Sequence, residues 1–141
     1  MTIDQLIKIV PVPNFTADEF HQASNGLFLY KPDHGLHLVR LLLWLAAIRK
    51  IYGSPLKITS AYRSPSRNVD VGGVATSRHL DGLALDIVPV GEGRTSDDWT
   101  GPVSYLHLVA HQTRLHHDYQ VAPFYRTHVH IEIDPQRKGG D

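Results

Sequence analysis

The feature that most constrains the fold is an aspartate in the middle of an apolar run. Residues 83–88 are apolar except for Asp86, and a short continuous apolar run is typical of a strand that is buried on both faces. An ionised carboxylate in such a strand is costly unless a cation lies beside it. A divalent metal would meet this need, and His79, seven residues earlier, supplies an imidazole for the same site.

The second feature is a segment near the C-terminus in which polar and apolar residues alternate. On a strand, His128, His130 and Glu132 project from one face, while the valine and isoleucines between them project from the other. Two imidazoles and one carboxylate leave one position open on a tetrahedral zinc, as in catalytic sites. On spacing alone, His79, Asp86 and both strand histidines are candidate ligands.

At these residues the chain resembles a known family. Ser-x-His-x-x-Gly-x-Ala-x-Asp, from Ser77 to Asp86, followed far downstream by His-x-His at 128–130, resembles the zinc D-Ala-D-Ala carboxypeptidases and peptidoglycan endopeptidases. This family shares a fold with the Hedgehog signalling domain. The resemblance extends upstream through the segments 58–65 and 71–74 and through Asn68, so that it covers roughly the central half of the chain.

The resemblance implies that His79, Asp86 and His130 bind Zn²⁺. Zinc with three protein ligands lowers the pKa of its water to about 7, so hydroxide is available to attack a peptide carbonyl. We expect His128, beside the last ligand, to stabilise the tetrahedral intermediate or to protonate the leaving amine.

Two further residues have implied substrate contacts. In the resembled family an arginine at the position of Arg63 binds a substrate carboxylate, a role that suits the guanidinium fork. A serine at the position of Ser77 contacts the substrate backbone. The alternatives are a surface or salt-bridged arginine and a serine whose hydroxyl serves a turn or a helix cap.

The general base is the part of the pattern that this chain lacks. Many relatives carry an acid three or about six residues before the last ligand, and here these positions are Thr127 and Phe124. The remaining candidates are Glu132, on the strand face of His130, and Asp118, before the strand. We favour Glu132, although either acid would also serve as a salt-bridge partner or as a partner of a ligand.

The whole chain, residues 1–141, is predicted to form one α+β domain with a small antiparallel sheet packed on buried helices, as in the Hedgehog and D-Ala-D-Ala peptidase fold. Besides the two strands above, the expected elements are a helix capped by Thr16 and Glu19, a long buried helix from about His34 to Tyr52 capped by Asp33, and a strand over 56–62. A helix is expected from Pro102 to His117, and His116 and His117 at its C-terminal end would interact favourably with the helix dipole. We expect loops over 64–75 and 91–100, the latter bordering the substrate groove, and a frayed tail over 135–141.

Composition narrows the classes of partner. The chain has no cysteine, so a metal site must use His, Asp or Glu. Its 14 basic and 14 acidic residues form no basic block, which argues against nucleic acid. The longest apolar run, 41–48, is too short to span a membrane, and the first residues do not resemble a signal peptide. We expect synthesis in the cytoplasm, with access to the cell wall by phage-type release, as for an endolysin, or as part of a virion.

The leading functional hypothesis is a zinc metallopeptidase that hydrolyses peptidoglycan stem peptides, either as a carboxypeptidase or as an endopeptidase. Thr127 and Phe124 motivate the main alternative, a catalytically silent, metal-stabilised module that binds the wall or belongs to a phage tail. A third hypothesis is an intracellular dipeptidase that never meets the wall.

Overall fold

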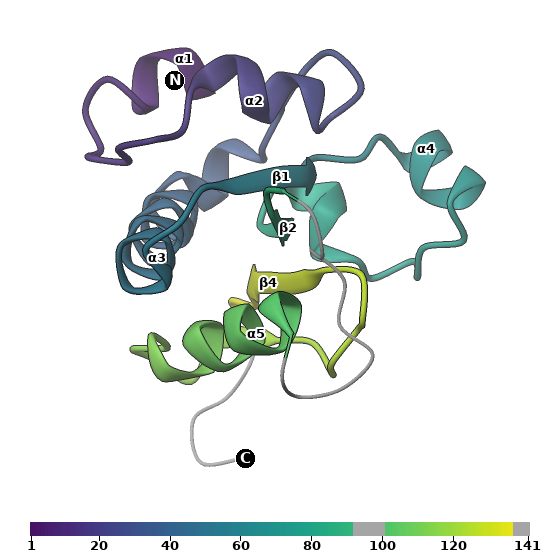
Figure 1. Cartoon of the computed structure of the whole chain (residues 1–141). Helices are drawn as coiled ribbons and strands as arrows, with labels where there is room; N and C mark the ends of the chain where they lie inside the picture. The colour runs from purple at the N-terminus through teal and green to yellow at the C-terminus, as the bar shows by residue number, and fades with distance from the viewer. Residues whose placement is uncertain (92–100, 137–141) are drawn as a thin grey trace.

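The computed structural model describes residues 1–91 and 101–136. Four antiparallel strands form one sheet in the order β1-β2-β4-β3 (Figure 1). The strands are β1 (Leu56–Ser60), β2 (Ala84–Pro89), β3 (Tyr119–Val121) and β4 (Val129–Ile133). The helices are α1 (Ile3–Leu6), α2 (Ala17–Gln22), α3 (Gly35–Tyr52), α4 (Pro65–Asp70) and α5 (Pro102–Gln112), with 3-10 turns η1 (Pro32–His34) and η2 (Arg78–Asp81).

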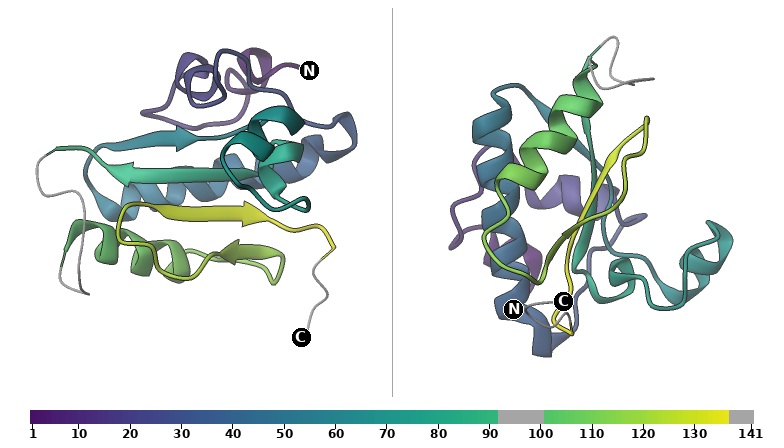
Figure 2. Two further views of the ribbon diagram at one scale, coloured as in Figure 1. Left: turned by 90° about the vertical axis from the view of Figure 1, so that its right-hand side faces the viewer. Right: turned by 90° about the horizontal axis from the view of Figure 1, so that it is seen from below.

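The sheet lies between a helical layer and the motif-bearing segments. Helices α3 and α5 pack together on one face, whereas η2 and α4 lie in front of the other face (Figure 2). The short helices α1 and α2 lie beyond the outer edge of β1 (Figure 1). The predicted α+β class, with an antiparallel sheet on buried helices, is confirmed. None of the described helices is long and apolar enough to cross a membrane.

The long apolar helix is the centre of the core. Leu41, Trp44 and Ile48 of α3 are almost completely buried, and the helix ends where Gly53 adopts a left-handed conformation with φ 80°. The predicted cap was wrong. Asp33 lies within η1, and α3 has His34 at its N-cap with no capping hydrogen bond from the side chain.

The expected N-terminal helix has its expected cap. The Thr16 hydroxyl accepts from Glu19 N at 3.3 Å, and Glu19 Oε2 accepts from Thr16 N at 2.8 Å. This box fixes the start of α2, whose Phe20 is fully buried. The same device at Thr2 and Gln5 begins α1, which we did not predict.

Three other predictions need correction. The segment 64–75 contains α4, because Ser64 caps a helix that has Pro65 in its first turn. Helix α5 ends at Gln112 rather than near His117, and His116 hydrogen bonds to Asp118 instead of facing a helix end. Strand β3 was not predicted, since three residues are too few to show an alternating pattern.

The two strands that matter most for function are neighbours. Asp86 of β2 pairs with His130 of β4, and Ala84 pairs with Glu132. The alternation predicted for β4 is confirmed, because its valine and isoleucines are buried whereas His130 and Glu132 are half-buried on the opposite face. The sheet register therefore places the distant halves of the motif side by side.

Candidate functional site

Three side chains from separate parts of the chain meet at the centre of the sheet. Their candidate ligand atoms, on His79, Asp86 and His130, all lie within 4.8 Å of one another. Asp86 Oδ1 is 2.8 Å from His130 Nδ1 and 3.4 Å from His79 Nε2. Within residues 1–91 and 101–136, this is the one group of three or more potential metal-binding side chains.

His79 shows that this cluster suits a metal ion. The residue is 1% exposed, and Nδ1 hydrogen bonds to the carbonyl oxygen of Ala61. Because a carbonyl only accepts, the proton is on Nδ1 and Nε2 carries a lone pair. Nε2 is buried and has no hydrogen-bond partner. An unpaired buried acceptor is unfavourable, and a cation shared with Asp86 and His130 would satisfy it.

The electrostatics of the cluster also favour a positive charge. Burial alone would raise the pKa of Asp86, but the hydrogen bond from His130 and the nearby His79 ring hold it well below its usual range. Burial would lower the pKa of His130, but its hydrogen bonds to Asp86 and Glu132 raise it to about 9. The protonated ring therefore supplies the cation between two carboxylates, and metal binding would release that proton.

The turn that carries His79 is held by its own polar contacts. Ser77 caps η2, accepting from His79 N at 3.2 Å, so the capping role considered for this serine is present. The Arg78 guanidinium contacts Asp81 and Asp134 at 2.8 Å each, and Lys31 contacts Asp81 at 2.9 Å. Since Arg78 and Asp81 are largely buried, this network fixes the turn against the end of β4.

Gly82 follows η2 at a point of close approach. Its φ is +76°, and a Cβ atom there would lie 2.4 Å from the carbonyl oxygen of Leu29 and 2.7 Å from Tyr30 Cβ. A side chain at this position would therefore displace backbone. The glycine of the motif is therefore required by the conformation and the close contacts of the backbone at this position.

Arg63 lies beside the cluster and has two kinds of contact with it. Its backbone N donates to the carbonyl of His79 at 2.9 Å, and its Nη2 lies 3.7 Å from Asp86 Oδ2. Its Nη1 donates to Asn68 Oδ1 at 3.3 Å. The guanidinium is thus held at the edge of the cluster with donors directed to it.

Asn68 is a site residue to which we gave no role from the sequence. Its side chain is buried, and while Oδ1 accepts from Arg63, Nδ2 donates to the Val74 carbonyl at 2.9 Å. A Cβ at Gly73 would lie 2.0 Å from Asn68 Oδ1, so this glycine leaves the space that the amide fills. In the sequence, Asn68 and the adjacent glycines at 72–73 were marked only as part of the segments that resemble the family. Their contact could not be predicted, because it depends on how the chain folds between α4 and Gly73.

His128 lies just before β4, on the side of the cluster. Its ring stacks on Tyr125, with centroids 4.8 Å apart and an angle of 11° between planes, and Nδ1 is 2.9 Å from the Thr127 hydroxyl. Burial lowers the pKa of His128, with the nearby positive charge of Arg63 acting in the same direction. A neutral ring whose Nδ1 accepts from Thr127 would carry its proton on Nε2.

The two candidate acids have different surroundings. Glu132 Oε1 is 2.7 Å from His130 Nε2, next to the cluster. Asp118 is buried in an ion pair in which Arg40 reaches both carboxylate oxygens, at 2.6 and 2.7 Å, and His116 adds a contact at 2.8 Å. The backbone of Asp118 pairs with Asp134, beyond the end of β4 and four residues from His130. The geometry argues against Asp118 as a base and brings Glu132 to the cluster.

A cleft of about 430 Å³ opens beside His130 and Glu132. Ser77 and Arg78 line it from η2, Tyr125 lines it from the segment before β4, and Val74 lines it from the segment after α4. Of the loop expected over 91–100, only Gly91 lies within the described residues. The lining of this cleft is therefore mainly polar.

Comparisons with known proteins agree with this geometry. The model of the peptidase M15 family matches residues 13–132. Among solved structures, the crystal structure of the Serratia marcescens L-Ala D-Glu endopeptidase ChiX is similar, with a TM-score of 0.50 and 20% sequence identity over 91% of this chain and 95% of that chain. At this identity, the likeness concerns the fold. The search of curated proteins finds no match.

Proposed function

The chain belongs to the peptidase M15 family, and on this basis we propose that it is a zinc-dependent peptidase of bacterial peptidoglycan stem peptides. The observation that carries the proposal is the buried, unpartnered Nε2 of His79, directed to the same place as Asp86 and His130. The similarity to an L-Ala D-Glu endopeptidase supports cleavage within a peptide, and removal of a terminal residue is the other form of the same activity.

We assign the metal to His79, Asp86 and His130. Zinc bound by these residues would act as a Lewis acid for water and for the scissile carbonyl. The Ala61 carbonyl keeps the His79 ring in the tautomer that leaves Nε2 available, as orienting partners of metal ligands commonly do. The pairing of β2 with β4 holds the other two ligands on a rigid sheet.

Glu132 is our choice for the residue that takes the proton of the attacking water. It is the carboxylate beside the cluster that is not one of the three proposed ligands, and it is half-buried at the cleft. Its hydrogen bond with His130 Nε2 also orients that ring. With this assignment, Glu132 takes the role of the acid that many relatives carry at the positions of Thr127 and Phe124.

His128, Arg63 and Ser77 would act on the substrate. A neutral His128 with its proton on Nε2 would donate to the developing oxyanion or to the leaving nitrogen. The Arg63 guanidinium, already beside Asp86, would bind a substrate carboxylate. Ser77 lines the cleft while capping η2, so its substrate contact would add to its capping role.

Purified protein supplied with zinc should release shortened peptides or new amino groups from peptidoglycan fragments. Mass spectrometry of the products would show which bond is cut. His79→Ala should abolish release, whereas His117→Ala, a change at an exposed histidine outside the cluster, should not. Equal release by the two variants would contradict the proposal.

The absence of an acid at Thr127 and Phe124 supports a second candidate, a metal-stabilised wall-binding or structural module without turnover. This candidate also requires the zinc site. The two candidates differ in one measurable outcome. For a module without turnover, zinc would stabilise the fold but no peptidoglycan fragment would be hydrolysed under any condition.

A further inference from the structure

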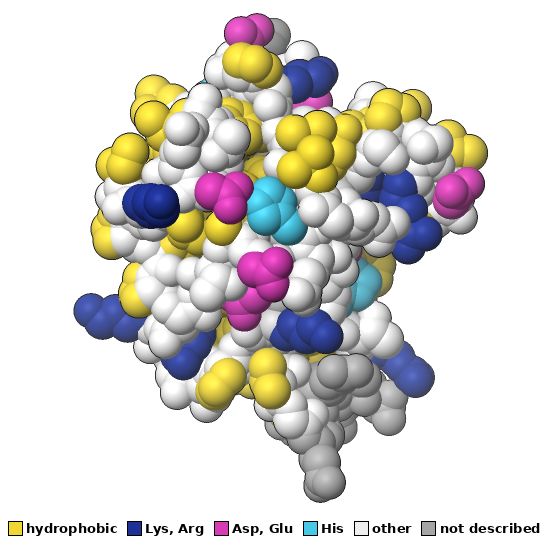
Figure 3. Space-filling model, turned by 90° about the horizontal axis from the view of Figure 1, so that it is seen from above, with side chains coloured by type: hydrophobic (Ala, Val, Ile, Leu, Met, Phe, Trp, Pro, Cys, Tyr) yellow, Lys and Arg dark blue, Asp and Glu magenta, His cyan; other side chains and the backbone are white. Residues whose placement is uncertain are grey.

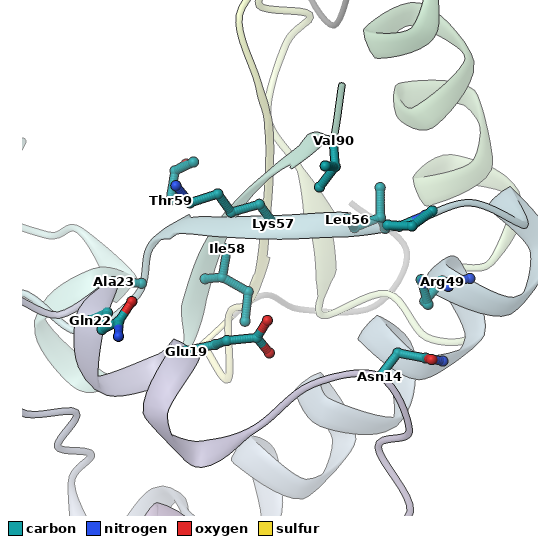
Figure 4. A pocket seen from close by; sticks show the side chains of 11 residues that line it. Asn14, Glu19, Gln22, Ala23, Arg49, Leu56, Lys57, Ile58, Thr59 and Val90 are labelled. Carbon is teal, nitrogen blue, oxygen red and sulfur yellow. The ribbon is translucent and has the colours of Figure 1, made fainter. Parts of the chain in front are cut away.

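A groove of about 700 Å³ runs along the outer edge of β1, away from the metal cluster. We call it the edge groove. Figure 4 shows β1 on one side and Glu19 and Gln22 of α2 on the other, with Arg49 of α3 at one end. A second cavity, of about 220 Å³, shares Gln22, Ala23 and Thr59 with the edge groove and reaches Arg63. The two cavities therefore extend from the edge of the sheet to Arg63, which lies beside the cluster.

The backbone of β1 has free hydrogen-bonding groups along this groove. Val90 N donates to the Pro55 carbonyl at 3.2 Å, and the register continues through Lys57 and Val88. Because antiparallel pairs alternate, Lys57 bonds to β2 whereas Leu56 and Ile58 direct their N–H and C=O groups outward. Within the described part of the chain, no backbone group pairs with these outward groups.

The charges along the groove are mainly positive. Arg49 and Lys57 line the edge groove, and Arg63 and Arg67 line the cavity that continues it. Basic side chains also gather toward the α4 side of the face in Figure 3. The acid of the groove, Glu19, already accepts the Thr16 N–H. In a chain of zero net charge, this concentration of cations favours a ligand with carboxylates.

We propose that the edge groove binds an extended, acidic peptide as an additional strand beside β1. The inference rests on the proposed function and extends it, because the peptide would be the second stem peptide of a cross-linked pair. Arg63 would hold one peptide at the cluster while Arg49 and Lys57 contact carboxylates of the other. The backbone from Leu56 to Arg63 spans about 23 Å when extended, which requires a substrate longer than one stem peptide.

The binding test does not depend on hydrolysis. The probe is a synthetic L-peptide of about seven residues that alternates threonine and glutamate, and its counterpart has lysine in place of glutamate. The acidic peptide should bind the zinc-loaded protein at least about tenfold more tightly than the basic one. Hydrogen exchange should slow at the Leu56 and Ile58 amides on binding, with no change at Lys57, whose amide already bonds to β2.

A charge-reversal pair locates the binding site. Lys57→Glu should weaken binding of the acidic peptide by about tenfold, whereas Lys8→Glu, an exposed change outside the groove, should leave it unchanged. Equal binding of the two peptides, equal effects of the two variants, protection elsewhere in the chain or no binding would each overturn the proposal.

Hydrolysis then links the groove to the wall. Lys57→Glu should raise KM for cross-linked stem-peptide dimers several-fold, with kcat and the KM for monomers unchanged. An equal change in KM for dimers and monomers would contradict the assignment of the second stem peptide to the edge groove. If neither substrate is hydrolysed, the proposed function fails while the peptide-binding result stands by itself.

Discussion

The Nδ1 atom of His79 hydrogen bonds to the Ala61 carbonyl, and this contact determines what the other ring nitrogen can do. It leaves Nε2 with a lone pair in a buried position without a partner. Ala61 directly follows β1, so the end of one strand orients a side chain that faces two others. The first prediction follows from this unsatisfied nitrogen.

Zinc should stabilise the folded protein through this cluster. A ligand that binds only the folded state at 100 times its Kd adds about 2.7 kcal/mol to the free energy of unfolding. Urea denaturation with zinc or with a chelator should show a gain of this size for the wild type and for His117→Ala. His79→Ala should lose most of it. A gain that survives in His79→Ala would mean that zinc binds elsewhere.

Two of the three proposed ligands could be selected from the sequence because each was marked by its own local pattern. Asp86 was out of place in an apolar strand, and His130 had its position on an alternating strand. His79 was linked to them only by the motif, since it lies on a 3-10 turn without periodicity. The contacts that orient these ligands, such as that of Ala61, depend on how the ends of strands meet and leave no such pattern.

Glu132 should have two separable roles. Glutamine keeps an acceptor for His130 Nε2 but cannot take a proton, so Glu132→Gln should lower kcat by about 100- to 1000-fold with zinc affinity unchanged. Glu132→Ala also frees the His130 ring and should weaken zinc binding by about tenfold or more. Steady-state kinetics and a competitive zinc titration would measure both. Wild-type kcat in Glu132→Gln would exclude this residue as the base.

Asp118 should contribute to stability rather than to turnover. Its side chain pairs with Arg40 through two hydrogen bonds and is almost fully buried. Removing one partner of such a pair leaves a partly buried charge unpaired, so Asp118→Asn should lower the free energy of unfolding by about 2 kcal/mol at pH 7. The kcat measured well below the unfolding temperature should be unchanged. A loss of kcat as large as that expected for Glu132→Gln would indicate that Asp118 takes part in catalysis.

The contribution of Asp118 should disappear in acid. Burial alone would raise the pKa of Asp118, but hydrogen bonds from Arg40 and His116 hold it below its usual value. A depressed folded-state pKa gives stability that is present above the unfolded pKa of about 3.9 and is lost as the pH falls through the folded value. The difference between wild type and Asp118→Asn should therefore shrink below about pH 4. A difference that stays constant between pH 7 and about pH 2 would contradict this assignment.

The choice between Glu132 and Asp118 illustrates what the sequence could not determine. Both acids lie near the last ligand in the chain, and only the pairing of Asp118 with Arg40, 78 residues away, separates them. The early end of α5 has a similar cause. Thr113 follows the helix, and its hydroxyl accepts from Trp44 of α3 at 3.0 Å, a contact with no local signal. The position of Asp118 and the end of α5 thus depend on polar partners far away in the chain. The packing of the sheet on the helices could be predicted, because it follows from local apolar patterns.

Asn68 should act on the substrate through Arg63. Asn68→Ala removes the acceptor of the Arg63 Nη1 hydrogen bond and should raise KM by about fivefold to tenfold for substrates with a free carboxylate. Asn68→Asp keeps that acceptor but adds a negative charge that pairs with the guanidinium, so it should also raise KM for these substrates. Steady-state kinetics on substrates with free and amidated carboxylates would separate these outcomes.

A double-mutant cycle tests whether the effect passes through the guanidinium. In an Arg63→Ala background, Asn68→Ala should have little further effect on KM, because the side chain that it positions is absent. The free energy of unfolding, measured for all four proteins, controls for loosening of the segment between α4 and η2. If Asn68→Ala raises KM equally in both backgrounds, Asn68 supports the fold of that segment and does not position Arg63.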